Sequence, residues 1–203
     1  MSIILPTHGQ SLWDTPLDTA LRTIASGQMH PNDHGWLAWV NDPSTCGASD
    51  GMTNGSVRMI KLPVLPQTYT ITSVKYFIAA AAVTPVAGQN FAGIYNSAGT
   101  RLAVSADISA DITTTGMKTW AMTAPLVVAA GTALWAAILC NAATPFTGVA
   151  SAAVTGRETL YNGDLAVAAA RYTSGPAAQT SLPASITMGA RTLLPRSSWV
   201  AVA

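Results

Sequence analysis

The sequence predicts an all-β fold: an antiparallel, jelly-roll-like β-sandwich preceded by a short N-terminal helix. Across residues 88–141, short apolar runs alternate with turn-forming stretches such as Asn-Ser-Ala-Gly and Ala-Ala-Gly-Thr, which is typical of strands joined by hairpins. Every residue of 134–140 is apolar, as expected for a central strand covered on both faces. The length of 203 residues fits one domain, so we assign residues 1–28 to an arm with the helix and 29–203 to the sandwich.

The arm contains one predicted amphipathic helix, residues 16–26. Thr15 stands at its N-cap, Pro16 takes the first helical position and Gly27 ends the run. The apolar stripe of the helix and the tryptophan at its entry are Trp13, Leu17, Ala20, Leu21 and Ile24. A helix this short is unstable alone in water. We therefore expect these side chains to form an oligomer or anchor interface; the alternative is that the chain's own sandwich covers them.

Three strands are expected before the central stretch, over residues 36–40, 57–62 and 69–79. Residues 41–55 consist of turn formers and are predicted to be a loop. In the third strand the apolar positions are odd-numbered up to Ile71 and even-numbered from Val74. A β-bulge between them, at Thr72 and Ser73, would restore a single inward face.

A hairpin is predicted inside the central stretch, with Gly99 supplying the left-handed residue of its turn. Ala92 and Ile94 share one face of the incoming strand, and Leu102 and Val104 share one face of the outgoing strand. We expect the hairpin to bring these two apolar faces together.

The last third of the chain has weaker patterns. Residues 144–156 are predicted as loop, and 165–170 as irregular loop and strand, with a helix as the competing interpretation. Residues 181–183 indicate an exposed or edge segment because they contain Pro. Residues 185–188 and 199–203 are expected to be closing strands.

The composition argues against several classes of partner. Only 9% of residues are charged, and ten basic residues nearly balance nine acidic ones, so nothing indicates nucleic acid or anionic lipid as a partner. The most apolar window, residues 124–143, contains Pro125, Gly131 and Asn141 and is not expected to span a membrane. The N-terminus has no secretory pattern, so we expect the chain to fold where it is made. A surface so poor in charge fits a subunit whose flanks are covered by neighbours.

The histidines and carboxylates are predicted to be structural. His30 and His34, with Asp33 between them, have a spacing that a metal could use on a helix, but Pro31 and Gly35 indicate a turn instead. The carboxylates considered for a hydrolytic pair are Asp107, Asp111 and Glu158; the first two are expected to cap turns. The sequence contains no GxSxG, GxGxxG or P-loop motif. We therefore predict no catalytic residue, no cofactor and no metal site.

The cysteines and most tryptophans are also expected to be structural. Cys46 and Cys140 are predicted to be reduced thiols, with a disulfide as the alternative. The tryptophans that lie in strand-like runs and are expected in the core are Trp36, Trp39, Trp120, Trp135 and Trp199.

Several turn-and-strand motifs are spread over most of the chain. They are WDTPL at residues 13–17, PNDHGWLAW at 31–39, GQNFAGIY at 88–95, GxK at 116–118 leading to TAP at 123–125, AAGT at 129–132, and SLPAS at 181–185 before WVA at 199–201. Together they resemble minor tail and tail-fibre proteins of phages that infect actinobacteria. These motifs specify fold and virion context rather than an activity.

The resemblance implies a non-enzymatic virion structural protein, on the tail rather than the capsid and assembled in the host cytoplasm. It also implies a host-surface-binding sandwich, an N-terminal virion-anchoring segment, other virion proteins and a host-surface glycan as partners, and self-association as a trimer. It brings no catalytic residue to map. The alternatives are a capsid decoration protein and a carbohydrate-active enzyme, which would need two close carboxylates in a cleft.

Overall fold

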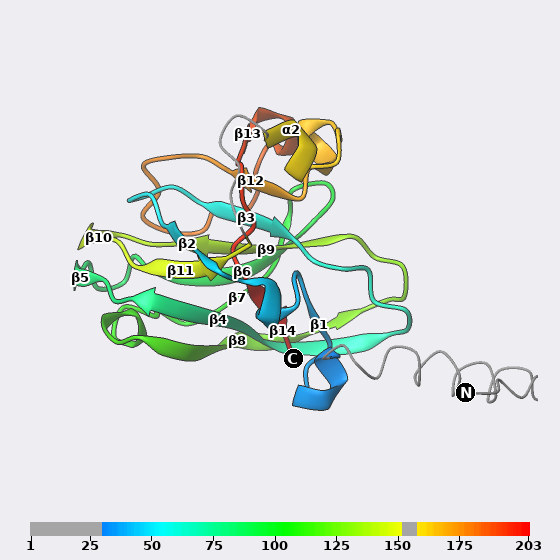
Figure 1. The fold of residues 1–203 in the computed structure, drawn as a ribbon, viewed down its shortest axis with the longest axis horizontal. Coiled ribbons are helices and arrows are strands. Elements are labelled where there is room, and N and C mark those ends of the chain that lie inside the picture. The colour runs from blue at the N-terminus through cyan, green and yellow to red at the C-terminus, as the bar shows by residue number, and fades with distance from the viewer. Residues whose placement is uncertain (1–29, 152–157) are drawn as a thin grey trace, which may run out of the picture.

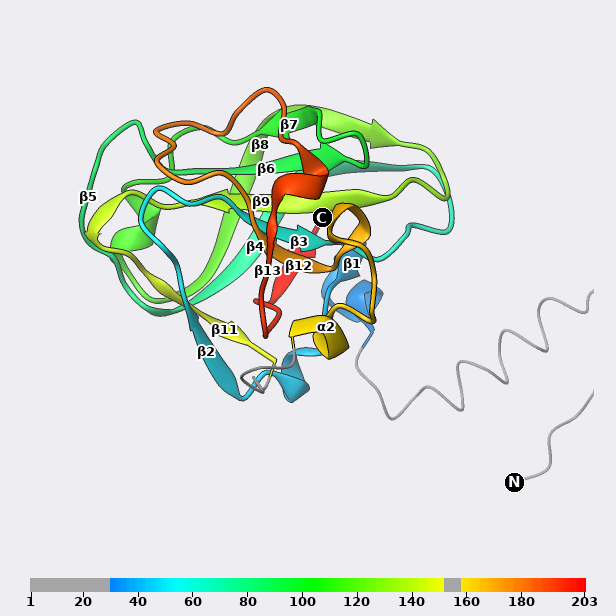
Figure 2. The ribbon, with the colours of Figure 1, turned by 90° about the horizontal axis from the view of Figure 1, so that it is seen from above.

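A computed structural model describes residues 30–151 and 158–203. The predicted helix of residues 16–26 and the arm that carries it lie outside these residues. The described residues form an antiparallel β-sandwich (Figures 1 and 2), which confirms the predicted all-β class.

Two six-stranded sheets make up the described sandwich, and neighbouring strands within each are antiparallel. The first sheet has the order β1 (Ala38–Trp39), β14 (Val200–Val202), β4 (Tyr69–Ala80), β11 (Thr147–Ala150) and β2 (Ala48–Gly51), with β8 (Gly116–Val128) also paired to β4. The second has the order β13 (Thr192–Leu193), β12 (Tyr172–Ser174), β3 (Arg58–Lys61), β9 (Leu134–Leu139), β6 (Phe91–Asn96) and β7 (Arg101–Val104).

Smaller elements connect these strands. A separate pair is formed by β5 (Val83–Pro85) and β10 (Ala142–Thr144). The short helices are α2 (Glu158–Tyr161) and the 3-10 turns η1 (Pro31–His34), η2 (Pro43–Thr45), η3 (Asp111–Thr113), η4 (Val167–Ala169) and η5 (Met188–Ala190). At one edge the sheets meet, because Ser105 bridges to Met122 and the Thr123 hydroxyl donates to the Val104 carbonyl at 2.9 Å.

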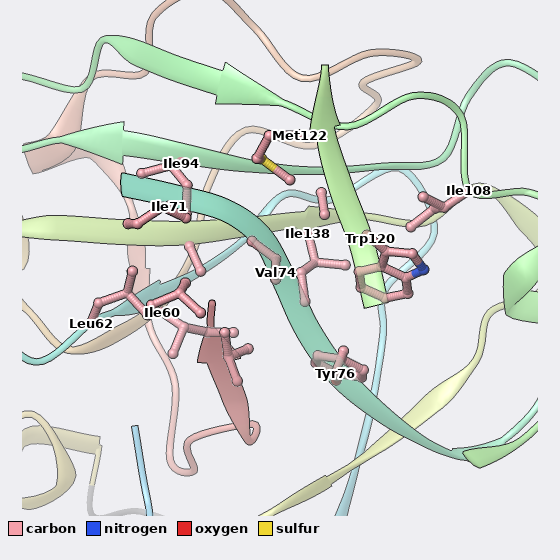
Figure 3. Packing of buried hydrophobic residues seen from close by; sticks show 14 of the residues in the cluster. Ile60, Leu62, Ile71, Val74, Tyr76, Ile94, Ile108, Trp120, Met122 and Ile138 are labelled. Atoms are coloured by element: carbon pink, nitrogen blue, oxygen red, sulfur yellow. The ribbon is translucent and has the colours of Figure 1, made fainter. Parts of the chain in front are cut away.

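The central strand β9 is buried along its whole length, as predicted. Alternate residues, including Ile138, face the main core between the sheets, where side chains from β3, β4, β6 and β8 converge (Figure 3). The other residues, including Trp135, face a second cluster that contains Leu182 and Ile186. The segment after β12 thus covers the outer face of the second sheet, which explains why β9 is apolar on both sides.

The predicted β-bulge in β4 is confirmed. The amides of Thr72 and Ser73 both donate to the Ala203 carbonyl, at 2.7 and 2.9 Å, so two residues oppose one. Ile71 and Val74 consequently lie in the same core, and Figure 3 shows β4 bending between them.

The hairpin of β6 and β7 forms, with Gly99 at φ 82°, but its predicted facing is wrong. Ile94 pairs with Ala103, and the register shifts at the next residue. The shift leaves Leu102 39% exposed, whereas Val104 packs against the second cluster. The extra residue of the outgoing strand therefore places Ala103, rather than Leu102 and Val104, on the face shared with Ile94.

Several short strands differ from the prediction. Residues 185–188 are not a strand: Ser185 makes one bridge to Thr100, and η5 follows. The predicted loops 41–55 and 144–156 contain β2 and β11, which pair with each other. Their sequences, Ala-Ser-Asp-Gly and Thr-Gly-Val-Ala, lack apolar alternation, so tertiary pairing decides their conformation. The strands β1 and β14 agree with the predictions for 36–40 and 199–203, although β1 is only two residues long.

We predict that Gly99→Ala lowers the free energy of unfolding by about 3 kcal/mol. Alanine at this position would have to adopt a positive φ, and its Cβ would overlap the Ile186 carbonyl. Gly131→Ala is the control: its φ is also positive, at 77°, but a Cβ would meet open space, so about 1 kcal/mol is expected. Urea unfolding of both variants measures the difference. Equal losses would show that contact with Ile186 is unimportant.

Candidate ligand-binding pocket

A buried polar cluster joins the two sheets. Asp50 of β2 accepts hydrogen bonds from the hydroxyls of Ser198, at 2.6 Å, and of Tyr172 in β12. Arg58 of β3 places Nη1 3.5 Å from the same carboxylate oxygen, and Asp50 and Arg58 are each 6% exposed. A buried charge is costly unless it is paired. We therefore infer that this cluster, which we call the Asp50 cluster, fixes the position of one sheet on the other.

Tyr76 lies beside the Asp50 cluster on β4. A Cβ on Gly148 would overlap the Tyr76 hydroxyl, so close packing requires glycine at that position of β11. Burial raises the pKa of Tyr76 and of Tyr172, so both phenols stay neutral at physiological pH. Ser198 is fully buried, which suits support of Asp50 rather than attack on a substrate.

Two further buried side chains hold the segment before and after β12. Asn162, next to α2, accepts from the Tyr172 amide at 2.8 Å and donates to the Glu158 carbonyl at 2.8 Å. Arg191 donates to the Thr173 hydroxyl at 3.0 Å and to the carbonyls of residues 167 and 168. Burial lowers the pKa of Arg191 to about 10, which leaves it charged at neutral pH.

A pocket of about 770 Å³ opens next to Tyr172, where the ends of β1, β3 and β12 approach α2. Figures 1 and 2 place α2 at the same end of the sandwich as β12 and β13. The described lining consists of Val40, Asn41, Lys61, Leu62, Pro63, Val64, Ser151, Leu160, Tyr161, Leu165, Arg171, Tyr172 and Ser197. Its size is that of sites for small organic ligands.

The lining is mixed in polarity and positive in charge. It contains Lys61 and Arg171, and none of its described residues is acidic. Lys61 Nζ donates to the Ala169 carbonyl at 3.3 Å and lies 5.2 Å from the centre of the Trp135 ring. Asn41 Nδ2 is buried and has no acceptor among the described residues. The pocket therefore offers hydrogen-bond donors and positive charge to a ligand.

A second surface feature is an aromatic cluster on the outer face of the first sheet. His34 stacks on Trp36 with ring centres 5.0 Å apart, and Trp36 contacts Trp199 edge-on at 5.4 Å. Trp120, Trp135 and Trp199 are buried, as predicted, whereas Trp36 is only partly buried. Beside the cluster is an apolar hollow of about 230 Å³ whose described lining is Pro43, Cys46, Phe77, Met117, Val149 and Trp199.

One prediction from the sequence concerns an oligomer or anchor interface. Trp13, Leu17, Ala20, Leu21 and Ile24 lie outside the described residues, so that prediction stays untested.

The histidine segment is the turn predicted from Pro31 and Gly35. His30 Nδ1 accepts from the Asn32 amide at 3.3 Å, and Asp33 accepts from the His30 amide at 3.0 Å. Within residues 30–151 and 158–203, no three His, Cys, Asp or Glu side chains are grouped as metal ligands.

Asp107 caps a turn, as predicted. It accepts from the amides of Gly88 and Asn90, at 2.9 and 3.2 Å, and from the Ser109 hydroxyl at 2.7 Å. Burial acts to raise the pKa of Asp107, but these hydrogen bonds together with one from the Ser109 amide hold it below its ordinary value. The carboxylate thus has a structural partner for each oxygen.

The two cysteines are free thiols in different clusters. Cys140 lies in the main core and Cys46 packs beside the aromatic cluster. Burial raises the pKa of Cys46, and that of Cys140 to about 11, so both stay protonated at neutral pH and are poor nucleophiles.

The pocket was not predicted from the sequence, because its walls come from separate segments without a motif. The one available signal was charge: Lys61 and Arg171 are conspicuous in a chain with so few charged residues. Neither any protein-family model nor any curated protein matches the sequence. Among the helices in the described ranges, none has the length and apolar character needed to cross a membrane.

We predict that Asp50→Asn lowers the free energy of unfolding by about 3 kcal/mol, because it leaves the buried Arg58 without a counter-charge. Tyr172→Phe removes one hydroxyl from the same carboxylate and is expected to cost about 1 kcal/mol. Guanidinium unfolding at neutral pH compares the two. A loss for Asp50→Asn no larger than that for Tyr172→Phe would contradict the assigned role of the ion pair.

Asp107 gives a pH-dependent prediction. Because its pKa is lower folded than unfolded, its contribution to stability is present above the unfolded value, about 4, and is lost as the pH falls through the folded value. Asp107→Asn should reduce stability at pH 7 and flatten its decline below about pH 4. Thermal unfolding from pH 2 to 7 measures this, with Asp111→Asn as a control that removes the same charge without the hydrogen bonds of Asp107. If stability declines below about pH 4 as steeply in Asp107→Asn as in the unsubstituted protein, the prediction is refuted.

Proposed function

We propose that this chain is a non-enzymatic structural protein of a virion, associated with the tail, whose sandwich binds a glycan of the host surface. The observation that carries the binding role is the pocket beside α2. Its described lining combines amide, hydroxyl and aromatic groups with apolar side chains, the mixture that a sugar ring with its hydroxyls requires. The Asp50 cluster holds Tyr172, a residue of the pocket lining, in a fixed position, and a binding site depends on such support.

The virion role rests on the resemblance of the turn-and-strand motifs to actinobacterial phage tail proteins. It is also supported by a surface that is poor in charge and carries exposed apolar side chains, among them Val83 and Val127. Such side chains suit an assembly in which neighbouring subunits cover them. A trimer, with Trp13, Leu17, Ala20, Leu21 and Ile24 at the interface or anchor, is part of this proposal.

The jelly-roll subtype also belongs to the proposal, and the strand order supports it. Eight strands, β1, β3, β4, β6, β7, β8, β9 and β14, can be numbered from one to eight along the chain. The sheets then contain the orders 1-8-3-6 and 2-7-4-5. Two interlocked Greek keys produce this order, and jelly rolls are common in viral structural proteins.

Binding is favoured over glycan hydrolysis by the positions of the carboxylates. A glycosidase requires two carboxyl groups facing each other across the substrate. The described lining of the pocket has none, and Asp107 is occupied by turn hydrogen bonds. The carbohydrate-active enzyme therefore stays the weaker alternative, and a capsid decoration protein is the alternative within the structural class.

We predict that the purified chain binds glycans extracted from the host envelope and that Leu160→Asp weakens this binding at least about fivefold, because it alters the rim of the pocket. Val127→Asp is the matched control: both side chains are 68% exposed, but Val127 lies on β8 outside the pocket lining. Biolayer interferometry measures the affinities. Equal weakening by both variants, or none by either, would contradict the site.

Labelled virions test the proposed location on the tail, and the purified chain with the envelope glycan tests the proposed absence of enzymatic activity. Gold-labelled antibody against the chain should mark the tail in electron micrographs. Label on the capsid would favour the decoration protein. Release of reducing ends from the envelope glycan, abolished by Asp107→Ala or Asp111→Ala, would establish the enzyme instead.

A further inference from the structure

We propose that the pocket beside α2 is selective for acidic saccharides, in which the sugar carries a carboxylate or a phosphate. This inference rests on the proposed function, since it names the ligand class of the same pocket. It follows from the arrangement of two cations, from an unpaired donor and from the apolar rim.

The two cations of the pocket are held side by side, and no described residue of the pocket lining is acidic. The Lys61 amide donates to the Arg171 carbonyl at 2.7 Å, which continues the antiparallel pairing of β3 with β12 and sets the two residues opposite each other. Like charges directly opposite on neighbouring strands are unfavourable. Neither side chain has an ion-pair partner among the described residues. An anion bound between them would remove the repulsion.

The side chains of Lys61 and Arg171 differ in how firmly they are held, and we therefore assign them different roles in binding. The Lys61 ammonium group is fixed by the Ala169 carbonyl and the Trp135 ring, so its positive charge stays at one place in the wall. Arg171 is exposed, and its guanidinium group has no hydrogen-bond partner among the described residues. A guanidinium group binds a carboxylate or phosphate through two parallel hydrogen bonds. Arg171 is therefore the residue that contacts the acid group, and Lys61 provides a fixed field.

Hydrogen bonding points to the same ligand class. The amide nitrogen of Asn41 in the pocket wall is buried without an acceptor among the described residues, which is an unfavourable state. A carboxylate or phosphate adds acceptors, whereas each hydroxyl of a neutral sugar also brings a donor that needs its own partner. The pocket thus has more to gain from an acidic than from a neutral saccharide.

The rim of the pocket carries apolar side chains that suit a sugar ring. Val64 and Leu160 are largely exposed at the opening, and Leu62 is buried behind them. Such side chains can pack on the C–H face of a sugar ring. Apolar walls also strengthen the attraction between the cations and an anion, because they exclude water.

Titrations of the full chain with three matched sugars test the inference. The probes are glucose, glucuronic acid and glucose 6-phosphate, which share one ring and differ at one carbon, and two-dimensional NMR reports binding at 20 mM salt. We expect at least one acidic sugar to bind about tenfold more tightly than glucose, with shifts at pocket residues, and this preference to shrink at 500 mM salt. The stronger of the two acids identifies whether carboxylate or phosphate is preferred.

Arg171→Gln should abolish the preference, because it removes the charge of the side chain that contacts the acid group. Lys118→Gln, the same loss of charge on β8, is the control and should keep the preference. Equal affinity for all three sugars, or a preference that survives in Arg171→Gln, overturns the inference and leaves the proposed glycan binding intact. Absence of binding by any sugar, together with absence of binding to the envelope glycan, overturns both.

Discussion

The buried carboxylate of Asp50 is the constraint on which much of this structure depends. It lies between the sheets and draws Arg58, Tyr172 and Ser198 toward one oxygen atom. Together with Asp50, these residues belong to or adjoin four different strands, so one charge sets the relative position of elements that are distant in sequence. Apolar packing tolerates small slides of one sheet over the other, whereas a buried ion pair with directed hydrogen bonds requires one arrangement.

The pocket inherits its geometry from this arrangement. Tyr172 is held by its hydroxyl in the Asp50 cluster and by its amide on Asn162, which is itself bonded to α2. Its neighbour Arg171 is consequently placed at the pocket opposite Lys61, and α2 is placed as a wall. The Asp50 cluster and the proposed ligand site thus meet at the start of β12, because Tyr172 belongs to the cluster and also lines the pocket. A substitution in the cluster would be expected to change ligand affinity as well as stability.

The sequence was most informative where strands are long and apolar. Residues 134–140 identified the central strand, and the slip of alternation at Thr72 and Ser73 located a real bulge, because both signals are local. The facing of Leu102 was wrong since one extra residue in a hairpin reverses every later side chain, and nothing in the sequence marks that residue. The strands β2, β11 and β12 were missed, because short runs of small and polar residues become strands only through their partners. The pocket could not be predicted for a similar reason: its walls meet only after the sheets have paired.

Scarcity of charge gives the few charged residues of this chain unusual weight. Arg58 and Arg191 are buried and have structural partners, so their charges are compensated or enclosed by carbonyl groups. Lys61, at the end of β3, and Arg171, just before β12, instead line the pocket of about 770 Å³. The described lining of this pocket contains no carboxylate. On a surface with many ion pairs, two cations would be screened and carry little information. Here no described residue of the lining is acidic, so the charges of Lys61 and Arg171 are not offset there, and the proposed selectivity of the pocket depends on them.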